Sequence, residues 1–389
     1  MSERRDNVAA AAGKAAVAAP APLAAHEAYE AQLAAPAATP AQIAAAAAEL
    51  AAGGLVAFPT ETVYGLGADA ENPAAVARIY EAKGRPNDHP VIVHVAPGAD
   101  LAYWATDIPE AAHQLAQAFW PGPLTMIVKR ASHIPDAVSG GQDTVGIRCP
   151  SHPVAIALLS AFKGGKGGVA APSANKFGNV SPTTAQHVRD EFHLGDHDEG
   201  ALGGAEACSV ALLRTVLEGG ASAVGIESTI VDLSRLATHG PVLLRPGHIS
   251  AEQIADVIGQ LPAAPDQAAP RASGTLESHY APRTPVTLIA HETLVATLTQ
   301  LQAKGVQVAL ISHSLPAPAS LVSHQRLLPA EPVGYAYGIY AALRDMDLVH
   351  ADVILVETPP QLPSWLGVND RLRRSVFGSS GVLAGLLKQ

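Results

Sequence analysis

The sequence predicts an α/β protein made of two units. Short apolar runs of strand length recur along its 389 residues, and segments long enough for a helix lie between many of them. A stretch that is dense in Pro, Ala and Gly and lacks a helical or strand period, 262–285, separates the earlier runs from the later ones. We therefore expect a larger unit before this linker and a smaller unit after it.

The chain begins with an extension that we expect to be loose, covering 1–38. It is mostly Ala with Pro, a composition that offers too little large apolar surface to offset the entropy of ordering. From Pro40 a run of strong helix formers continues to Gly53 and Gly54, where a helix is expected to stop. The apolar run LVAF follows at once and predicts the first strand of the larger unit, which we place at 39–261.

Further strands and helices are predicted in both units. In the larger unit the strand-like runs are Val91–Val95, Leu124–Val128, Thr144–Ile147, Val169–Ala171 and Ser228–Leu233, and the predicted helices are Pro73–Ala82, Pro109–Phe119 and Pro153–Phe162. In the smaller unit, 286–389, the runs VTLIA, VQVALIS and ADVILVET alternate with helical segments at 291–304 and 334–348. This alternation predicts a second α/β domain.

Charge and cysteine content exclude several classes of protein. The formal net charge of -10 is spread along the chain, which argues against nonspecific binding to nucleic acid or to an anionic membrane. The two cysteines, Cys149 and Cys208, lie far apart and have no metal-ligand spacing, so neither a disulfide framework nor a zinc knuckle is predicted. No apolar stretch reaches the ~20 residues of a membrane helix, and no signal-peptide pattern is present. We expect a cytoplasmic protein.

A polar stretch, PTETVYGLG at 59–67, follows the first predicted strand. Three consecutive side chains with a hydroxyl or carboxyl group and two closely spaced glycines are poor material for a core, so we expect them to line a binding site. The run from Gly65 to Ala70 also fits the GxGxxA dinucleotide fingerprint. We reject that reading because six residues separate the first glycine from the strand and no acidic residue ends a second strand about 20 positions later.

Two other motif readings are weak. The run Gly164–Gly168 lacks a Ser or Thr after its lysine, so a flexible loop insertion is favoured over a phosphate-binding Walker loop. Two histidines at i, i+4, His193 and His197, lie beside carboxylates, but Gly195 weakens any helix that would align them. A solvated loop is therefore favoured there over a metal site.

Basic residues follow the second predicted helix in the run Lys83-Gly84-Arg85-Pro86. The proline holds Arg85 near an extended conformation, and two cations on a tight turn would suit a polyphosphate. The alternative is a solvated helix terminus, where Lys and Arg are common. On this stretch alone the solvated terminus is favoured.

Hydroxyl and amide side chains follow a later strand in the runs APSAN, at 171–175, and NVSPT, at 179–183. Such side chains and the backbone N–H groups beside them can bind phosphate oxygens. Ser181 or Thr183 could equally be the N-cap of a helix at 184–192, and taken singly the cap is favoured.

Arginines occur at strand ends in a chain that has only 25 Lys plus Arg. Arg148 ends the run TVGIR, and Arg245 lies in LRPG, close to the polar run GIEST at 225–229. A lone arginine is usually a surface residue, but several at strand ends are harder to dismiss. Ligands of open α/β sheets bind where strands end, so a binding site is the alternative that we favour for these arginines.

Taken together and in order, the motifs resemble the YrdC-like family of threonylcarbamoyl-AMP synthases. They are PTETVYGLG, KGRP, VIVHV, WPGPLT, DTVGIR, APSAN, SP, GIESTIVDL and LRPG. The resemblance covers about 40–258, and the linker with the C-terminal unit is similar to the two-domain form of these enzymes. It implies a YrdC-like twisted mixed sheet with a ligand cleft, followed by a smaller Rossmann-like domain.

The resemblance implies an activity and its substrates. Such enzymes combine L-threonine, bicarbonate and ATP into threonylcarbamoyl-AMP and pyrophosphate, for the threonylcarbamoyladenosine modification of tRNA. The implied cofactor is Mg²⁺ carried by ATP, with no prosthetic group. The product would pass to the tRNA threonylcarbamoyl transferase machinery, with at most weak contact to tRNA and none to a membrane.

The resemblance also implies roles for individual residues. Those assigned to L-threonine are Thr62, His94, Arg148, Ala171 and Ser228. Those assigned to ATP are Lys83, Arg85, His89, Thr144, Ser173, Asn175, Ser181, Arg245 and Tyr280. Lys83 and Arg85 are also the expected catalytic residues, and Arg148 would bind the threonine carboxylate through two charge-assisted bonds. His89 stands where the family often has Asn.

The linker has two possible roles. It contains the pair His279 and Tyr280, and the resemblance implies that it closes over the nucleotide, although composition alone favours a passive tether.

Two alternative functions of the whole protein are considered. One is a carbamoyltransferase of hydrogenase maturation, whose zinc fingers this chain cannot supply with two cysteines, and the other is a non-catalytic RNA-binding module.

Overall fold

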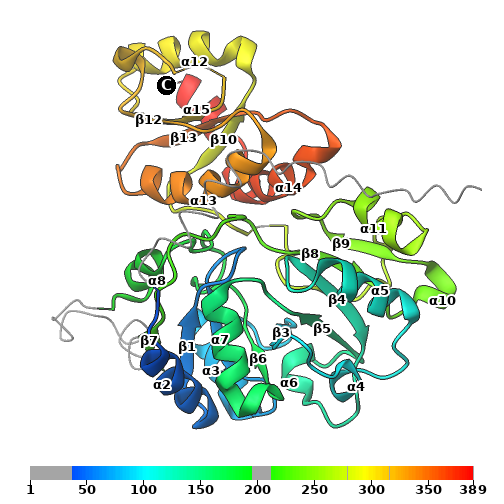
Figure 1. The fold of residues 1–389 in the computed structure, drawn as a ribbon. Helices are drawn as coiled ribbons and strands as arrows, with labels where there is room; N and C mark the ends of the chain where they lie inside the picture. Colours follow the sequence, from blue (N-terminus) through cyan, green and yellow to red (C-terminus); the bar gives the residue numbers. More distant parts are fainter. Residues whose placement is uncertain (1–36, 195–211, 278, 315, 389) are drawn as a thin grey trace, which may run out of the picture.

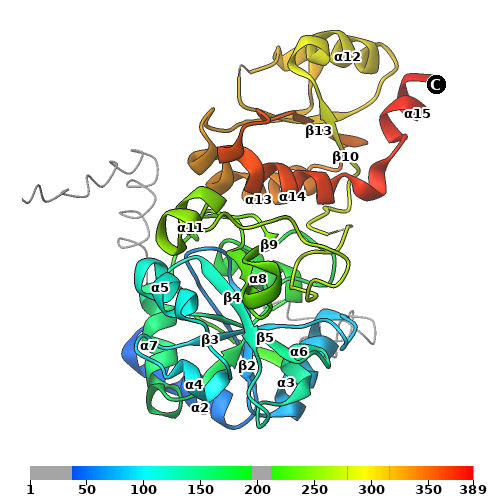
Figure 2. The same ribbon diagram turned by 90° about the vertical axis from the view of Figure 1, so that its right-hand side faces the viewer.

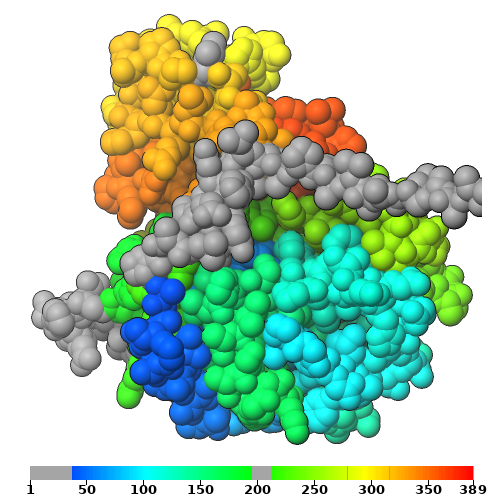
Figure 3. Space-filling model, in the orientation of Figure 1, coloured from blue at the N-terminus to red at the C-terminus, as the bar shows by residue number. Residues whose placement is uncertain are grey.

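The computed structural model describes residues 37–194, 212–277, 279–314 and 316–388. Within them, a larger unit drawn in blue to green carries one β-sheet, and a smaller unit drawn in yellow to red carries another (Figure 1). The space-filling view shows the smaller unit lying above the larger one (Figure 3). The prediction of two α/β units is confirmed. Most of the expected N-terminal extension and of the possible metal loop at 193–199 lies outside the described residues.

The larger sheet is mixed, with the strand order β7-β1-β2-β6-β3-β5-β4-β8-β9 among the described residues. Its strands are β1 Leu55–Phe58, β2 Gly65–Asp69, β3 Ile92–Val95, β4 Leu124–Lys129, β5 Thr144–Arg148, β6 Gly168–Ala170, β7 Leu213–Val216, β8 Thr229–Asp232 and β9 Val242–Arg245. β3 and β5 are parallel, while β1 and β2 are antiparallel. Because β3 and β5 are parallel neighbours, their final residues, which come from distant parts of the sequence, lie at the same edge of the sheet.

All six strands predicted in the larger unit are confirmed, and three others were missed. The strand β2 has the sequence GLGAD, which has no apolar alternation, and it is buried on both faces. The strand β7 is half-exposed at the sheet edge, so it lacks the apolar run of a buried strand. The strand β9 has the sequence VLLR, of which the sequence analysis singles out only the final arginine, as part of LRPG.

Helices cover this sheet on both sides (Figure 2). They are α2 Pro40–Ala51, α3 Pro73–Lys83, α4 Leu101–Trp104, α5 Glu110–Phe119, α6 Asp136–Ser139, α7 Pro153–Ala161, α8 Ala185–Phe192, α10 Leu236–His239 and α11 Ala251–Ile258. The helix α3 begins where the Asn72 side chain accepts hydrogen bonds from Ala74 N and Ala75 N, and it ends at Gly84, whose φ is 63°. A left-handed residue at this point turns the chain sharply. This turn places Lys83 and Arg85 at the end of the helix.

The glycine-rich run at 164–168 is a packed turn, so the prediction of a flexible loop insertion is wrong. A Cβ atom on Gly168 would lie 2.5 Å from the Trp104 ring, and one on Gly167 would lie 2.7 Å from the Phe162 ring. Beside them, Lys163 Nζ lies 2.7 Å from a carboxylate oxygen of Asp69. Gly167 and Gly168 are therefore required by close packing against aromatic rings.

The smaller unit has a parallel sheet in the order β10-β13-β11-β12 among the described residues. Its elements are β10 Val286–Ile289, α12 His291–Ala303, β11 Val308–Ser312, β12 His324–Leu327, α13 Pro332–Asp347, β13 Val353–Glu357, α14 Leu366–Ser375 and α15 Val382–Lys388. The three predicted strands and both predicted helices are confirmed. The strand β12 was missed because its four residues, HQRL, are all exposed.

The two units share one apolar cluster. Val63, Val180 and Ile226 of the larger unit pack with residues of α13 and α14 and with Tyr280 of the linker. The approach is close, because a Cβ atom on Gly225 would lie only 2.3 Å from the carbonyl oxygen of Ala336 in α13. The smaller unit is therefore docked on the larger one through α13 and α14 (Figures 1 and 2).

Candidate active site

A cavity lies where several strands and loops of the larger unit meet the linker. Its lining residues are Thr60, Thr62, Val63, Gly65, Lys83, Arg85, Ile92, His94, Arg148, Ala171, Pro172, Ser173, Glu227, Ser228, Arg245, Ser273, Gly274, His279 and Tyr280. The polar stretch at 59–67 therefore lines a cavity, as the sequence predicts. Among the described residues this wall carries four cationic side chains and one carboxylate, so it suits an anionic ligand.

The PTET stretch forms a tight polar turn after β1. The Thr60 hydroxyl donates to Val63 O at 2.6 Å and accepts from the backbone N–H groups of Thr62 and Val63, both at 3.3 Å. Its oxygen also lies 2.9 Å from the Thr62 hydroxyl. The side chain of Thr60 thus folds the turn, which leaves Thr62 in the cavity wall.

Arg148, at the end of β5, is buried and already partly bonded. Its Nη2 donates to Glu61 Oε1 at 2.6 Å, and its Nε donates to Gly122 O at 3.3 Å. The other oxygen of Glu61 accepts from Ser151 N at 3.1 Å. A ligand carboxylate would therefore share the Arg148 guanidinium with Glu61. We expected that the ligand alone would bind this guanidinium, through two hydrogen bonds.

Lys83 is buried, so the solvated-terminus interpretation of KGRP is wrong for this residue. Its Nζ donates to Ser173 O at 2.6 Å and to Asn175 O. Burial, and then the charge of Arg85, lowers the pKa of the Lys83 ammonium well below its ordinary value. The turn at Gly84 thus places the Lys83 side chain in the cavity wall, where two backbone carbonyl groups of the APSAN segment bind its ammonium group.

Arg85 lies beside Lys83 in the cavity wall. Its Nη2 donates to Pro90 O at 3.0 Å, and its Nε is buried without a partner among the described residues. Burial lowers the pKa of this guanidinium from its ordinary value. A buried donor without a partner is costly, and a ligand oxygen would relieve that cost.

Arg245 joins the end of β9 to the start of β8 and to the linker. Its Nε and Nη2 donate to Ser228 O at 3.0 and 2.9 Å, and Nη2 also donates to Ser228 Oγ at 3.1 Å. Its Nη1 donates to Ser273 O at 2.8 Å. Ser228 and Arg245, predicted for different substrates, are therefore direct neighbours.

His94 and Ala171 complete the wall on the sheet side. His94 lies on β3, and its Nδ1 is buried without a partner among the described residues. Burial, and then the charge of Arg148, lowers the pKa of this imidazole to about 3, so the ring is neutral near pH 7. Ala171 is fixed by the bond of its backbone N–H to Ile92 O at 2.9 Å.

Four residues predicted for ATP do not line the cavity: His89, Thr144, Asn175 and Ser181. Thr144 is buried at the start of β5, where it pairs with Lys129. The Asn175 side chain donates to Lys176 O and Asn179 O, at 2.7 and 2.9 Å, and so shapes the turn behind the wall. His89 lies outside the wall, with its ring 5.8 Å from that of Phe177.

Ser181 is bonded to the cavity wall from behind. Its hydroxyl donates to Glu227 Oε1 at 2.6 Å. The suggestion that Ser181 or Thr183 is a helix cap is wrong, because α8 begins after Thr184, whose side chain accepts from His187 N. The sequence favours the wrong residue because three hydroxyl side chains precede this helix within four positions.

The linker forms one side of the cavity, which disfavours the passive-tether interpretation. Tyr280 is buried in a left-handed conformation, with φ of 60°, and its ring lies 5.6 Å from the ring of Tyr340 in α13. The backbone N–H of Ala281 donates to Gly178 O at 3.0 Å. The linker is therefore fixed to both units.

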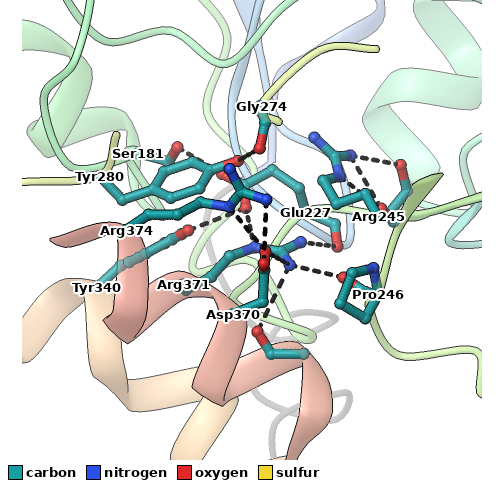
Figure 4. A network of polar contacts seen from close by, with 12 residues as sticks. Ser181, Glu227, Arg245, Pro246, Gly274, Tyr280, Tyr340, Asp370, Arg371 and Arg374 are labelled. Carbon is teal, nitrogen blue, oxygen red and sulfur yellow. Dashed lines mark hydrogen bonds and ion pairs between the residues drawn. The ribbon is translucent and has the colours of Figure 1, made fainter. Parts of the chain in front are cut away.

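Several residues around the cavity escaped the sequence analysis. Glu227, in the middle of GIEST, accepts hydrogen bonds from Tyr340 of α13 and Arg371 of α14, both at 2.9 Å (Figure 4). The motif GIEST singled out the segment but gave Glu227 no role. Arg371 carried no signal, because the charged run NDRLRR is typical of an exposed helix face.

Two negative findings apply to the described ranges, which omit 1–36 and 195–211. No group of three or more His, Cys, Asp or Glu side chains in these ranges could hold a metal ion. No helix in the same ranges has both the length and the apolar character needed to cross a membrane.

Comparison with known families identifies both units. The Sua5/YciO/YrdC family model, described as "Telomere recombination", matches residues 48–247. The model of the threonylcarbamoyl-AMP synthase C-terminal domain matches residues 249–376. Together these matches cover nearly all of the two units.

Similar proteins have the same two-domain extent. A threonylcarbamoyl-AMP synthase of Pyrococcus abyssi is 36% identical over 337 residues, covering 83% of this chain and 90% of that protein. One of Bacillus subtilis is 36% identical over 335 residues, with the same coverage. The crystal structure of Pyrococcus abyssi Sua5 complexed with L-threonine superposes with a TM-score of 0.76 at 34% identity, covering 87% of this chain and 95% of that chain. The chain therefore belongs to the family of threonylcarbamoyl-AMP synthases, nucleotidyltransferases that serve the modification of tRNA.

Proposed function

We propose that the cavity holds L-threonine and ATP side by side and joins them through bicarbonate. The observation that carries this proposal is the convergence of Lys83, Arg85, Arg148 and Arg245 on one cavity beside the linker. These cationic side chains gather at one cavity although the chain as a whole has a net charge of -10. Such a site suits a triphosphate and a carboxylate.

The threonine half-site consists of the PTET turn and the ends of β3 and β5. Arg148, with Glu61 as its fixed partner, binds the carboxylate through a charge-assisted hydrogen bond. Thr62 and the neutral ring of His94 lie in the same part of the wall and offer hydrogen-bonding groups to the polar atoms of the amino acid. The crystal structure of the related Pyrococcus abyssi protein with L-threonine supports this choice of ligand.

The ATP half-site consists of Lys83, Arg85, Ser173 and Arg245, with Tyr280 closing it from the linker. Mg²⁺ comes with ATP as part of the substrate. Glu227, the one carboxylate that the described residues place on this wall, has both oxygens bonded, so the ion is carried by the phosphates. Asn175 and Ser181 act from behind the wall, by shaping the turn around Lys83 and by orienting Glu227.

The chemistry follows from this arrangement. The amine of threonine attacks the carbon of bicarbonate, and loss of water gives an N-carboxylate. An oxygen of this group then attacks the α-phosphorus of ATP as the bond to pyrophosphate breaks. Lys83 and Arg85 stabilise the charge that develops on the phosphates, and the bound reactants are held in line. The product is a reactive mixed anhydride, and the linker limits its loss to water by acting as a lid.

The product is passed to the tRNA threonylcarbamoyl transferase machinery, so we place the protein in the cytoplasm. Contact with tRNA itself is weak, since the net charge of -10 opposes it.

The test is pyrophosphate release measured with each substrate omitted in turn. Release is expected only when L-threonine, bicarbonate and ATP are all present, because the attacking group is made from two of them. Equal release without bicarbonate would contradict the proposed order of steps.

A further inference from the structure

The buried carboxylate of Glu227 raises a problem for the proposed site. Glu227 lies in the wall of a cavity that would take two anions, a triphosphate and a carboxylate. A negative charge facing these ligands at short range in a partly desolvated site would repel them. Its influence reaches the cations, because the charge of Glu227 opposes the lowering of the Lys83 pKa that burial causes.

Three donors hold this carboxylate, and two of them come from the C-terminal domain (Figure 4). Ser181 Oγ donates to Oε1 at 2.6 Å. The Tyr340 hydroxyl and Arg371 Nε both donate to Oε2 at 2.9 Å. The larger unit therefore bonds this carboxylate through a neutral hydroxyl and adds the charge of Arg245 without a direct bond, while the cation bonded to the carboxylate, Arg371, comes from α14.

Arg371 is bonded to more than the carboxylate. Its Nη2 donates to Glu227 O at 3.0 Å, and its Nη1 donates to Pro246 O at 2.6 Å. These carbonyl groups belong to the two loops that carry Ser228 and Arg245. One side chain of the C-terminal domain thus ties together both loops on this side of the cavity.

The position of Arg371 is itself rigid. The side chain is 1% exposed, and its guanidinium lies 5.7 Å from the ring centre of Tyr280 in the linker. Asp370 accepts from Arg371 at 3.3 Å and also pairs with Arg374 at 3.0 Å, and Ser375 Oγ donates to Tyr280 O at 2.7 Å. The same turn of α14 therefore holds both the linker and the carboxylate in the cavity wall.

We propose that Arg371 is a positioning residue, which neutralises Glu227 and turns its carboxylate away from the ligands, so that docking of the C-terminal domain is required for tight binding of ATP. This inference rests on the proposed function, since it assumes that the cavity takes ATP. Removal of one partner from a buried ion pair leaves the other charge uncompensated. Without Arg371, Glu227 would pair with Arg245 or Lys83 and withdraw a cation from the phosphates.

The experiment is a double-mutant cycle of Arg371→Met and Glu227→Gln, with the ATP dissociation constant and the KM for ATP as readouts. Arg371→Met is expected to weaken ATP binding by at least about tenfold, within the usual range of coupling between sites. In the Glu227→Gln background the same substitution should change ATP binding by less than about threefold, because no carboxylate then needs compensation. A merely structural role for Arg371 predicts the same loss in both backgrounds, which would overturn the proposal.

A matched control is Arg373→Met, which removes an exposed arginine of the same helix that lies away from the cavity wall. It is expected to leave ATP binding unchanged. If Arg371→Met does not fold, as judged by its thermal unfolding, Tyr340→Phe replaces it, because this change removes one hydrogen bond to Glu227 with almost no change in volume. Tyr340→Phe should weaken ATP binding about two- to fivefold, and only when Glu227 is present. Unchanged ATP binding in this variant would overturn the proposal.

The two proposals fail in different ways. Direct ATP binding tests the role of Arg371 even if the wild-type protein releases no pyrophosphate with threonine and bicarbonate, a result that would contradict the proposed function alone. Normal wild-type turnover together with unaltered ATP binding in the folded Arg371→Met variant would contradict the role of Arg371 alone.

Discussion

Protonation of Glu227 is expected to destabilise the folded protein as the pH falls below about 4.5. The Glu227 side chain is 6% exposed, and it accepts hydrogen bonds from Ser181 of the larger unit and from Tyr340 and Arg371 of the smaller one. Burial by itself would raise its pKa, but Arg371, Arg245 and the Ser181 hydroxyl outweigh burial and lower the pKa to about 2. The folded protein therefore keeps Glu227 ionised under conditions in which the unfolded chain takes up the proton.

The sign and size of the effect follow from this difference. A carboxyl whose pKa is lowered on folding contributes stability that is fully present above its unfolded pKa, near 4.5, and that is lost as the pH falls through its folded pKa, near 2. At about 1.4 kcal/mol per unit, the contribution is on the order of 3 kcal/mol, of which roughly 2 kcal/mol is lost by pH 3.

The assay is urea unfolding of the wild-type protein and of Glu227→Gln between pH 7 and pH 3. Other carboxyls titrate in both proteins, so the difference between their free energies of unfolding isolates Glu227. We expect the wild-type advantage to shrink by roughly 2 kcal/mol over this range. Asp256→Asn, at an exposed carboxylate of α11, serves as the control for the general effect of removing one acidic side chain. An advantage of the same size at pH 7 and pH 3 would refute this account of Glu227.

Three further predictions concern the substrates, the linker and the domain interface. Arg148→Ala should raise the KM for threonine about tenfold or more, since a hydrogen bond to a charged group contributes roughly 1.5 to 3 kcal/mol; weakened ATP binding with threonine binding intact would reverse our assignment of the half-sites. Proteolysis within 270–283, which includes residues of the cavity wall, should slow when ATP and threonine are bound, and ligand-independent cleavage would leave the lid without support. Gly225→Ala should destabilise the protein by more than Gly259→Ala does. Both glycines have positive φ, but only at Gly225 would the new Cβ lie 2.3 Å from a backbone oxygen of α13. Similar losses in the free energy of unfolding, each about 1 to 2 kcal/mol, would show that the domain interface adjusts to the added methyl group.

Much of the site could be predicted because its residues lie in short motifs at strand ends. The runs PTET, KGRP and APSAN each follow a regular element, so a polar or cationic side chain there is placed by local backbone geometry. Ten of the predicted residues, Thr62, Lys83, Arg85, His94, Arg148, Ala171, Ser173, Ser228, Arg245 and Tyr280, do line one cavity. Local sequence sets which groups are available at the ends of the strands.

What local sequence determined about this protein was the position along the chain of six strands of the larger unit and three of the smaller one, the helices between them, and the supply of cations around the cavity. These depend on apolar periodicity and turn chemistry over a few residues. Only the tertiary structure decided which of several neighbouring hydroxyl groups caps α8, that Arg148 is shared with Glu61, and that Glu227 is neutralised by Arg371, 144 residues further along the chain. The physical reason is that the state of a buried charge depends on which donors the fold brings within bonding distance, and here the decisive donor belongs to another domain.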